Sequence, residues 1–223
     1  DHLANRRDAG TQAEVGAGVH RDGDAAFGKE FKLVRFHYSV DDIFARNEYI
    51  RYPSKWERTQ EVFHILDKET PDNVEVTIAC SVQFLNAYYI PEFIKWKLEQ
   101  NFKKINVWPQ TGGGVNFHFV YHPAHLNVKV LPQWFKAEIR KKYEEFIPWW
   151  EDNWKMGVRE DITFDEWRNN KYGVKTLYSI LDFMEAEDWS VRLPETKEFL
   201  QLCDKQRGIS FAETFPEMSR VFL

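Results

Sequence analysis

Cysteine is scarce in this chain of 223 residues, which has only Cys80 and Cys203. Two thiols cannot build a disulfide framework, so a reducing, cytoplasmic location is expected. They also fall short of the three or four thiolates by which proteins hold an iron–sulfur cluster. The sequence therefore excludes a cluster bound by this chain alone.

Long apolar runs and an excess of positive charge are also missing. No stretch approaches the roughly 20 apolar residues needed to cross a bilayer, and no signal-peptide pattern is present. The formal net charge is −5, so the chain has no basic field that would attract phosphate backbones. We expect neither a membrane nor a nucleic-acid partner.

Large apolar side chains are almost absent from residues 1–28, which instead hold five of the eleven glycines. Such a segment buries too little surface to offset the entropy of ordering it. The composition predicts a disordered leader or processing remnant over 1–28, and an ordinary flexible terminus is the plainer alternative.

Aromatic and β-branched residues become frequent from Phe31 onward, and strand patterns then alternate with helix patterns. Strands are predicted at 31–38, 74–80, 105–108 and 115–121, and helices after Pro53 and Pro91. This alternation predicts an α/β fold with a parallel sheet. About 100 residues are too few for a closed eight-stranded barrel. An open sheet would instead expose its edge strands unless tail helices, a second copy or an N-terminal half cover them.

The remainder of the chain has helical patterns. Helices are predicted to begin near Pro132 and Pro194, the second ending at Gly208, with another along 174–184 and a capping box at 163–166. The expected division is a leader at 1–28, an α/β part at 29–150 and an α-helical tail at 151–223.

Polar residues gather where the first predicted strand ends, at Ser39, Asp41 and Asp42. Ligands of parallel α/β folds collect at the carboxyl ends of strands. A hydroxyl beside carboxylates suits ribose hydroxyls or an ammonium group. Capping of backbone amides in a strand-to-helix turn is an equally open interpretation.

The second predicted strand carries a similar group, Thr77, Ser81 and Asn86. These side chains offer donors and acceptors to a ligand, with helix entry again the alternative. Arg51 lies between two tyrosines, where it could bind a carboxylate. A surface ion pair or a cation–π contact is the plainer interpretation. Cys80 is expected to be a buried core thiol rather than a nucleophile.

Three histidines, His118, His122 and His125, lie close together in sequence. In an extended strand the first two would be about 13 Å apart, too far for one metal ion. We therefore predict no metal site here.

Several motifs in order resemble the C-terminal half of radical S-adenosylmethionine (radical SAM) enzymes that carry a twitch domain. Ser39-Val-Asp-Asp42 and Tyr49-Ile-Arg-Tyr-Pro-Ser-Lys-Trp56 resemble the stretch after their fourth barrel strand. Thr77 to Asn86, followed by Tyr88 to Phe93, is similar to their fifth strand and helix, and Val120 to Pro132 to their sixth strand. The resemblance implies a partial (β/α), TIM-like barrel followed by a helical tail.

The resemblance also implies a cofactor site. Ser39 and Asp41 would contact polar groups of S-adenosylmethionine, Arg51 its carboxylate, and Thr77, Ser81 and Asn86 would lie lower in the pocket. The family's Cys-x₃-Cys-x₂-Cys is absent and Asp42 replaces the usual glycine. A [4Fe–4S] cluster, and with it any activity, would require an N-terminal half.

A different class of function stays open beside this one. The chain could be a non-catalytic α/β plus helical module that binds a protein partner or forms a homo-oligomer. The density of tryptophans in the tail favours this alternative, because exposed aromatic patches mark interfaces.

Overall fold

The computed structural model describes residues 13–15, 31–105, 114–153 and 172–223. The predicted capping box at 163–166 lies outside these residues. So does most of the predicted strand at 105–108, of which Ile105 forms an isolated parallel bridge with Val76.

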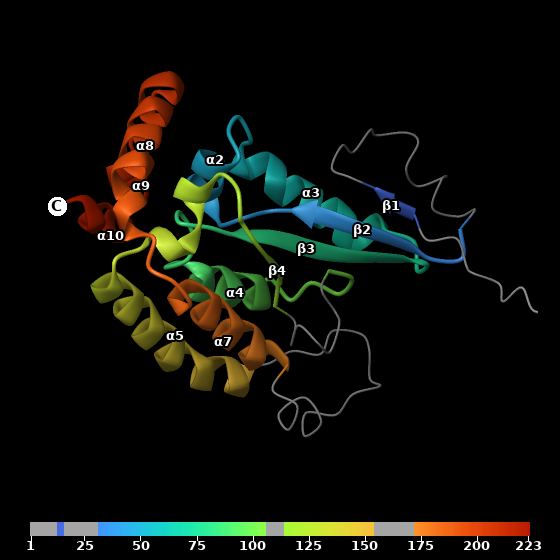
Figure 1. Cartoon of the computed structure of the whole chain (residues 1–223). Coiled ribbons are helices and arrows are strands. Elements are labelled where there is room, and N and C mark those ends of the chain that lie inside the picture. The colour runs from blue at the N-terminus through green and yellow to red at the C-terminus, as the bar shows by residue number, and fades with distance from the viewer. Residues whose placement is uncertain (1–12, 16–30, 106–113, 154–171) are drawn as a thin grey trace, which may run out of the picture.

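The described strands form one parallel sheet in sequence order (Figure 1). They are β1 (Ala13–Val15), β2 (Val34–Ser39), β3 (Val74–Val82) and β4 (Asn116–Phe119). The predicted α/β class with parallel strands is confirmed. The described strands make an open sheet, however, and do not close into a barrel. The three residues of β1 fall within the segment for which disorder was predicted.

Helices follow the strands and fill the second half of the chain. They are α2 (Phe44–Ile50), α3 (Trp56–Glu69), α4 (Ile90–Glu99), α5 (Gln133–Asn153), α7 (Tyr172–Glu185), α8 (Leu193–Arg207), α9 (Phe211–Thr214) and α10 (Pro216–Ser219). The helices predicted near Pro53, Pro91, Pro132 and Pro194 are confirmed, and α8 ends at Gly208 with φ 66°. Helix α2 is an element that the sequence patterns did not predict.

One face of the sheet is apolar and covered by helices. Alternate residues of β3, Val76, Ile78 and Cys80, are buried in one cluster with residues of α3 and α4. The rings of Trp56 in α3 and Trp96 in α4 are 5.2 Å apart. The two helices therefore contact each other on the same face, as right-handed crossovers between neighbouring parallel strands require.

The opposite face carries the intervening residues of β2, β3 and β4, and most of these residues are polar. We call it the polar face; it consists of Arg35, His37, Ser39, Glu75, Thr77, Ala79, Ser81, Asn116 and His118. None of these residues belongs to either apolar cluster. Parallel sheets are usually buried by apolar layers on both faces, so a polar face on this sheet is an exception that a functional explanation must address.

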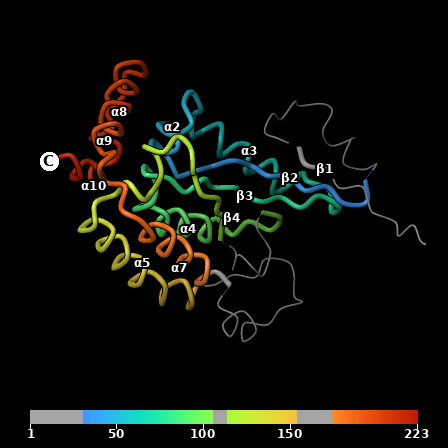
Figure 2. Tube along the Cα trace, in the orientation of Figure 1, coloured from blue at the N-terminus to red at the C-terminus, as the bar shows by residue number. Residues whose placement is uncertain are grey.

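The helical tail packs at the end of the sheet toward which the strands point, an arrangement that Figure 2 also traces. Tyr49 of α2 makes an edge-to-face contact of 5.3 Å with Phe215, between α9 and α10. Phe119 of β4 stacks on Phe183 of α7 at 4.1 Å. One apolar cluster thus contains residues from both sides of position 150. Among the described residues, no helix has the length and apolar character to span a membrane.

Candidate functional site

The carboxyl ends of β2 and β3 are joined by the segment that follows Ser39. The backbone N–H of Val40 donates to the carbonyl of Ala79 at 3.1 Å. The carboxylate Oδ1 of Asp41 then accepts the backbone N–H of Ser81 at 2.7 Å. Two predicted site residues from different strands therefore meet at one edge of the sheet.

Helix α2 brings Arg51 back to this edge. Its seven residues reverse the chain, and Arg51 Nε lies 2.9 Å from Asp41 Oδ2. Asn47, in the same helix, accepts the backbone N–H of Asp41 at 3.1 Å. The Arg51 side chain is 31% exposed. Within the described part of the chain, its two terminal amino groups make no hydrogen bond, so they can still bind a carboxylate.

Asn86 links the two strand ends through hydrogen bonds of its side-chain amide. Its Nδ2 donates to the carbonyls of Asp41 at 2.8 Å and Ser81 at 3.0 Å, and its Oδ1 accepts the N–H of Gln83 at 2.9 Å. The side chain is 0% exposed, and both of its amide groups are occupied. Asn86 therefore positions the site, and it lacks a free group for a ligand.

The three predicted hydroxyls lie on the polar face, but they differ in availability. Those of Ser39 and Ser81 are half-buried, and the described residues offer neither a hydrogen-bond partner. Thr77 lies farther from the strand ends, and its hydroxyl is 2.6 Å from His37 Nδ1. The serines can therefore bind a ligand without first giving up a protein contact.

Cys80 faces the helices, not the polar face. Burial, and then the nearby carboxylates of Asp41 and Asp42, raise the pKa of its thiol well above the usual value. Its Sγ is 3.5 Å from the Asp41 carbonyl. The prediction of a buried core thiol is confirmed.

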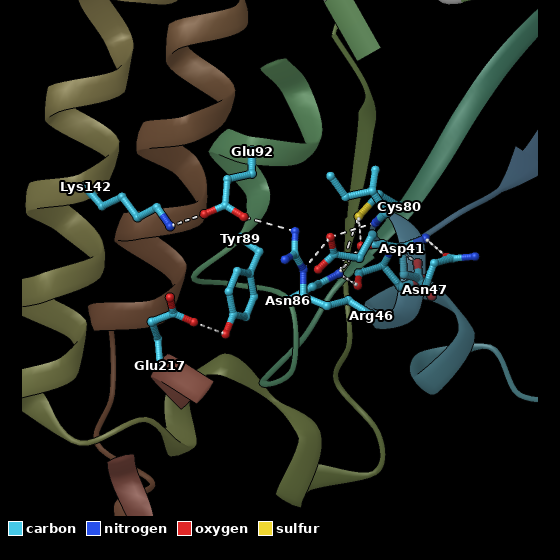
Figure 3. Close-up of polar contacts among 12 residues, drawn as sticks. Asp41, Arg46, Asn47, Cys80, Asn86, Tyr89, Glu92, Lys142 and Glu217 are labelled. Atoms are coloured by element: carbon cyan, nitrogen blue, oxygen red, sulfur yellow. Dashed lines mark hydrogen bonds and ion pairs between the residues drawn. The ribbon is translucent and has the colours of Figure 1, made fainter. Parts of the chain in front are cut away.

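Asp42 fits the capping interpretation. Its Oδ1 accepts the backbone N–H of Ile43 at 2.7 Å, where α2 begins, and Arg46 Nε at 3.0 Å. Asp41 and Asp42 are neighbours in sequence, but they have different partners. Figure 3 shows the groups around Asp41 and Arg46.

The three histidines are dispersed. His118 is an exposed member of the polar face, His122 is exposed in the next loop, and the His125 ring packs 4.9 Å from that of Phe199. Across the described ranges, no three or more His, Cys, Asp or Glu residues are grouped so that they could hold a metal ion.

Two residues of the site were not predicted. His37 shares the polar face with Thr77, a pairing that the alternation of β2 could have revealed. Asn47 belongs to the unpredicted helix α2, and no pattern indicated its contact with Asp41.

The chain matches no known family model, no curated protein and no solved structure. The site itself therefore has to carry the functional argument. It combines two free serine hydroxyls, a buried carboxylate and an arginine with two free amino groups at the carboxyl edge of a parallel sheet.

Proposed function

We propose that this chain forms one half of a partial (β/α) barrel whose polar face binds S-adenosylmethionine, as in radical SAM proteins with a twitch domain. The main supporting observation is that α3 and α4 pack together on the apolar face of the sheet, while the polar face displays hydroxyl, imidazole and amide groups. Helices on one side and polar groups on the other are what a strand layer needs if it lines a binding site.

The donor types at the strand ends fit that ligand. The hydroxyls of Ser39 and Ser81 suit the ribose hydroxyls. The free amino groups of Arg51 suit the methionyl carboxylate, and Asp41 orients Arg51 through the 2.9 Å ion pair. Asn86 and Thr77 support this arrangement from within the protein.

An iron–sulfur cluster does not fit the residues of this chain. Its two cysteines are buried, Cys80 in the sheet and Cys203 in α8. Two thiolates are fewer than a [4Fe–4S] cluster requires. The cluster therefore belongs to a separate N-terminal half in this proposal, and we assign no radical chemistry to the residues described here.

The alternative of a partner-binding module rests partly on exposed tryptophans in the tail, and this argument is weaker in the structure. Trp150 is buried in the core, and Trp149 and Trp189 pack against it. Two further tail tryptophans, Trp154 and Trp167, lie outside the described residues. No residue of the polar face belongs to an apolar cluster of the described residues, which favours an added layer, and under the proposal that layer is the N-terminal half.

Calorimetric titration of the purified chain with S-adenosylmethionine tests the proposal. Removing one hydroxyl in Ser39→Ala or Ser81→Ala should weaken binding about fivefold to tenfold, the equivalent of one hydrogen bond. Ser179→Ala is the matched control, because that exposed hydroxyl bonds only to its own helix.

The role of Arg51 is tested with a second ligand. Arg51→Gln should weaken binding of S-adenosylmethionine but leave methylthioadenosine, which lacks the carboxylate, unaffected. No binding by the wild-type chain, either alone or mixed with a cysteine-bearing N-terminal half, would refute the proposal. Equal affinities in the Ser39, Ser81 and Ser179 variants would refute the site assignment.

A further inference from the structure

A row of alternating charges connects the strand-end site to helix α5. Arg46 in α2 contacts Asp42 through Nε at 3.0 Å and Glu92 of α4 through Nη2 at 3.0 Å. Lys142 of α5 contacts the other oxygen of Glu92 at 2.7 Å. Figure 3 shows Arg46, Glu92 and Lys142 in this order, with Tyr89 beside them. Two cations and two anions thus link three helices.

Asp42 is the buried end of this row. The residue is 1% exposed, and its Oδ1 receives both the Ile43 N–H and Arg46. Its Oδ2 is buried and has no hydrogen-bond partner among the described residues. An ionised carboxylate with one empty buried oxygen is costly, whereas a proton on that oxygen removes the charge.

We infer that Asp42 is a protonation switch that sets how firmly α2 is held against the sheet, and thereby the geometry of the strand-end site. Helix α2 carries Asn47, which fixes the backbone of Asp41, and it leads directly to Arg51. Any loosening of α2 therefore moves two of the partners of Asp41, Asn47 and Arg51.

Burial, rather than the surrounding charges, determines the direction of the switch. Burial raises the pKa of Asp42 from 3.8 to about 7, against the lowering effects of Arg46 and the Ile43 N–H and with a small contribution from Glu92. The other charged or titratable groups facing this region are Asp41 and Arg51 at the strand end, Cys80 in β3, Lys142 in α5, Tyr89 at the start of α4 and Glu217 in α10. Burial therefore outweighs the ion pair with Arg46.

Helix α2 should loosen as the pH rises. The closed state holds the Asp42 proton up to about pH 7, whereas a solvated Asp42 loses it near its ordinary pKa of 3.8. Between these values, each pH unit favours the opened state by up to tenfold, and the effect levels off above the higher one. From pH 6 to pH 8 the opening equilibrium of α2 should increase by about tenfold.

Hydrogen exchange of the peptide that contains α2, followed by mass spectrometry at pH 6 to 8, measures this equilibrium. After division by the intrinsic exchange rate, the wild type should open about ten times more often at pH 8. Asp42→Asn, which mimics the neutral form, should show no such increase. Asp182→Asn, an exposed change on α7, is the matched control and should behave as the wild type.

A second variant tests the row of charges. Lys142→Gln leaves the charge of Glu92 less balanced, so the transition should move to higher pH. A flat wild-type profile, or the wild-type transition persisting in Asp42→Asn, would overturn the inference. The assay contains no ligand, so its result stands apart from the proposal that the polar face binds S-adenosylmethionine.

Discussion

Replacing Asn86 should be the most damaging polar substitution at the strand ends. Asn86→Ala removes three hydrogen bonds to backbone groups, namely the carbonyls of Asp41 and Ser81 and the N–H of Gln83, together with a weaker contact to Cys80 Sγ. Each buried backbone group left without its partner costs about 1–3 kcal/mol, a range that already includes the lost hydrogen bond, and we take values toward its lower end for the three groups. Solvent cannot readily replace these contacts, because Asn86 is fully buried. We expect a loss of about 3–5 kcal/mol in the free energy of unfolding.

Urea unfolding, followed by tryptophan fluorescence and circular dichroism, gives this quantity directly. For a chain of this size, the same loss should lower the melting temperature by on the order of 10 °C. Asn86→Asp keeps the acceptor for Gln83 but removes both donors, so it should also be strongly destabilising. Asn153→Ala is the matched control, since its side chain bonds, among the residues that the structure describes, to the Trp149 carbonyl of its own helix; it should cost less than about 0.5 kcal/mol.

The size of the predicted loss in the free energy of unfolding allows the role of Asn86 to be refuted. A cost below about 1 kcal/mol for Asn86→Ala, at an unchanged urea dependence, would mean that the strand ends do not rely on this side chain. A cost equal to that of Asn153→Ala would have the same meaning. The position of Asp41, and with it the proposed site, would then need another source of order.

Three further outcomes are expected elsewhere in the chain. Gly208→Ala should cost about 1 kcal/mol in urea unfolding, because a left-handed φ of 66° strains any Cβ even though no atom lies within 4 Å of it; Gly208→Asn should cost less. Tyr49→Phe should lose about 1.5 kcal/mol, since its hydroxyl donates to the Asp204 carboxylate at 2.7 Å, and little more should be lost when Asp204→Asn is added. Cys80 should resist iodoacetamide at pH 8 until urea unfolds the chain, because burial raises the pKa of its thiol; peptide mass spectrometry measures the labelling.

The main elements of the fold were predictable from local patterns. Strands β2, β3 and β4 lie within one or two residues of the predicted runs at 31–38, 74–80 and 115–121, apart from a longer shift where β2 begins. Those runs combine β-branched and aromatic residues without breakers. Proline at the start of α4 and α8, and glycine at the end of α8, likewise signal helix boundaries locally.

Helix α2 escaped prediction for a physical reason. It is seven residues long, and its N-cap is Ile43, which has no side chain able to cap it. The carboxylate of Asp42 bonds to the Ile43 N–H instead, and Phe44 adopts a φ of 53° that its sequence does not favour. Tertiary contacts therefore stabilise α2, and a short helix of this kind leaves little periodic signal.

The candidate site was predictable as a location but not as a set of free groups. Parallel strands bring their carboxyl ends together, so Ser39, Asp41 and Ser81 were expected to be neighbours. The pattern could not show that the Asn86 amide is hydrogen-bonded to backbone groups, or that the Thr77 hydroxyl bonds to His37. Availability depends on long-range partners, and these follow only from the assembled structure.

The structure shows what the Asp42 side chain does at the position where the proposed radical SAM resemblance expects a glycine. Where the pattern has glycine, Asp42 supplies the carboxylate that engages Arg46, and Arg46 continues through Glu92 to Lys142 in α5. A glycine at this position could not make the first of these contacts. The Asp42 carboxylate therefore connects the strand-end site to α5, while the side chains of Ser39, Asp41 and Arg51 make no hydrogen bond with this row among the described residues. The proposed ligand binding and the proposed protonation switch can thus be tested by separate mutations, because Ser39 belongs to the polar face and Asp42 does not.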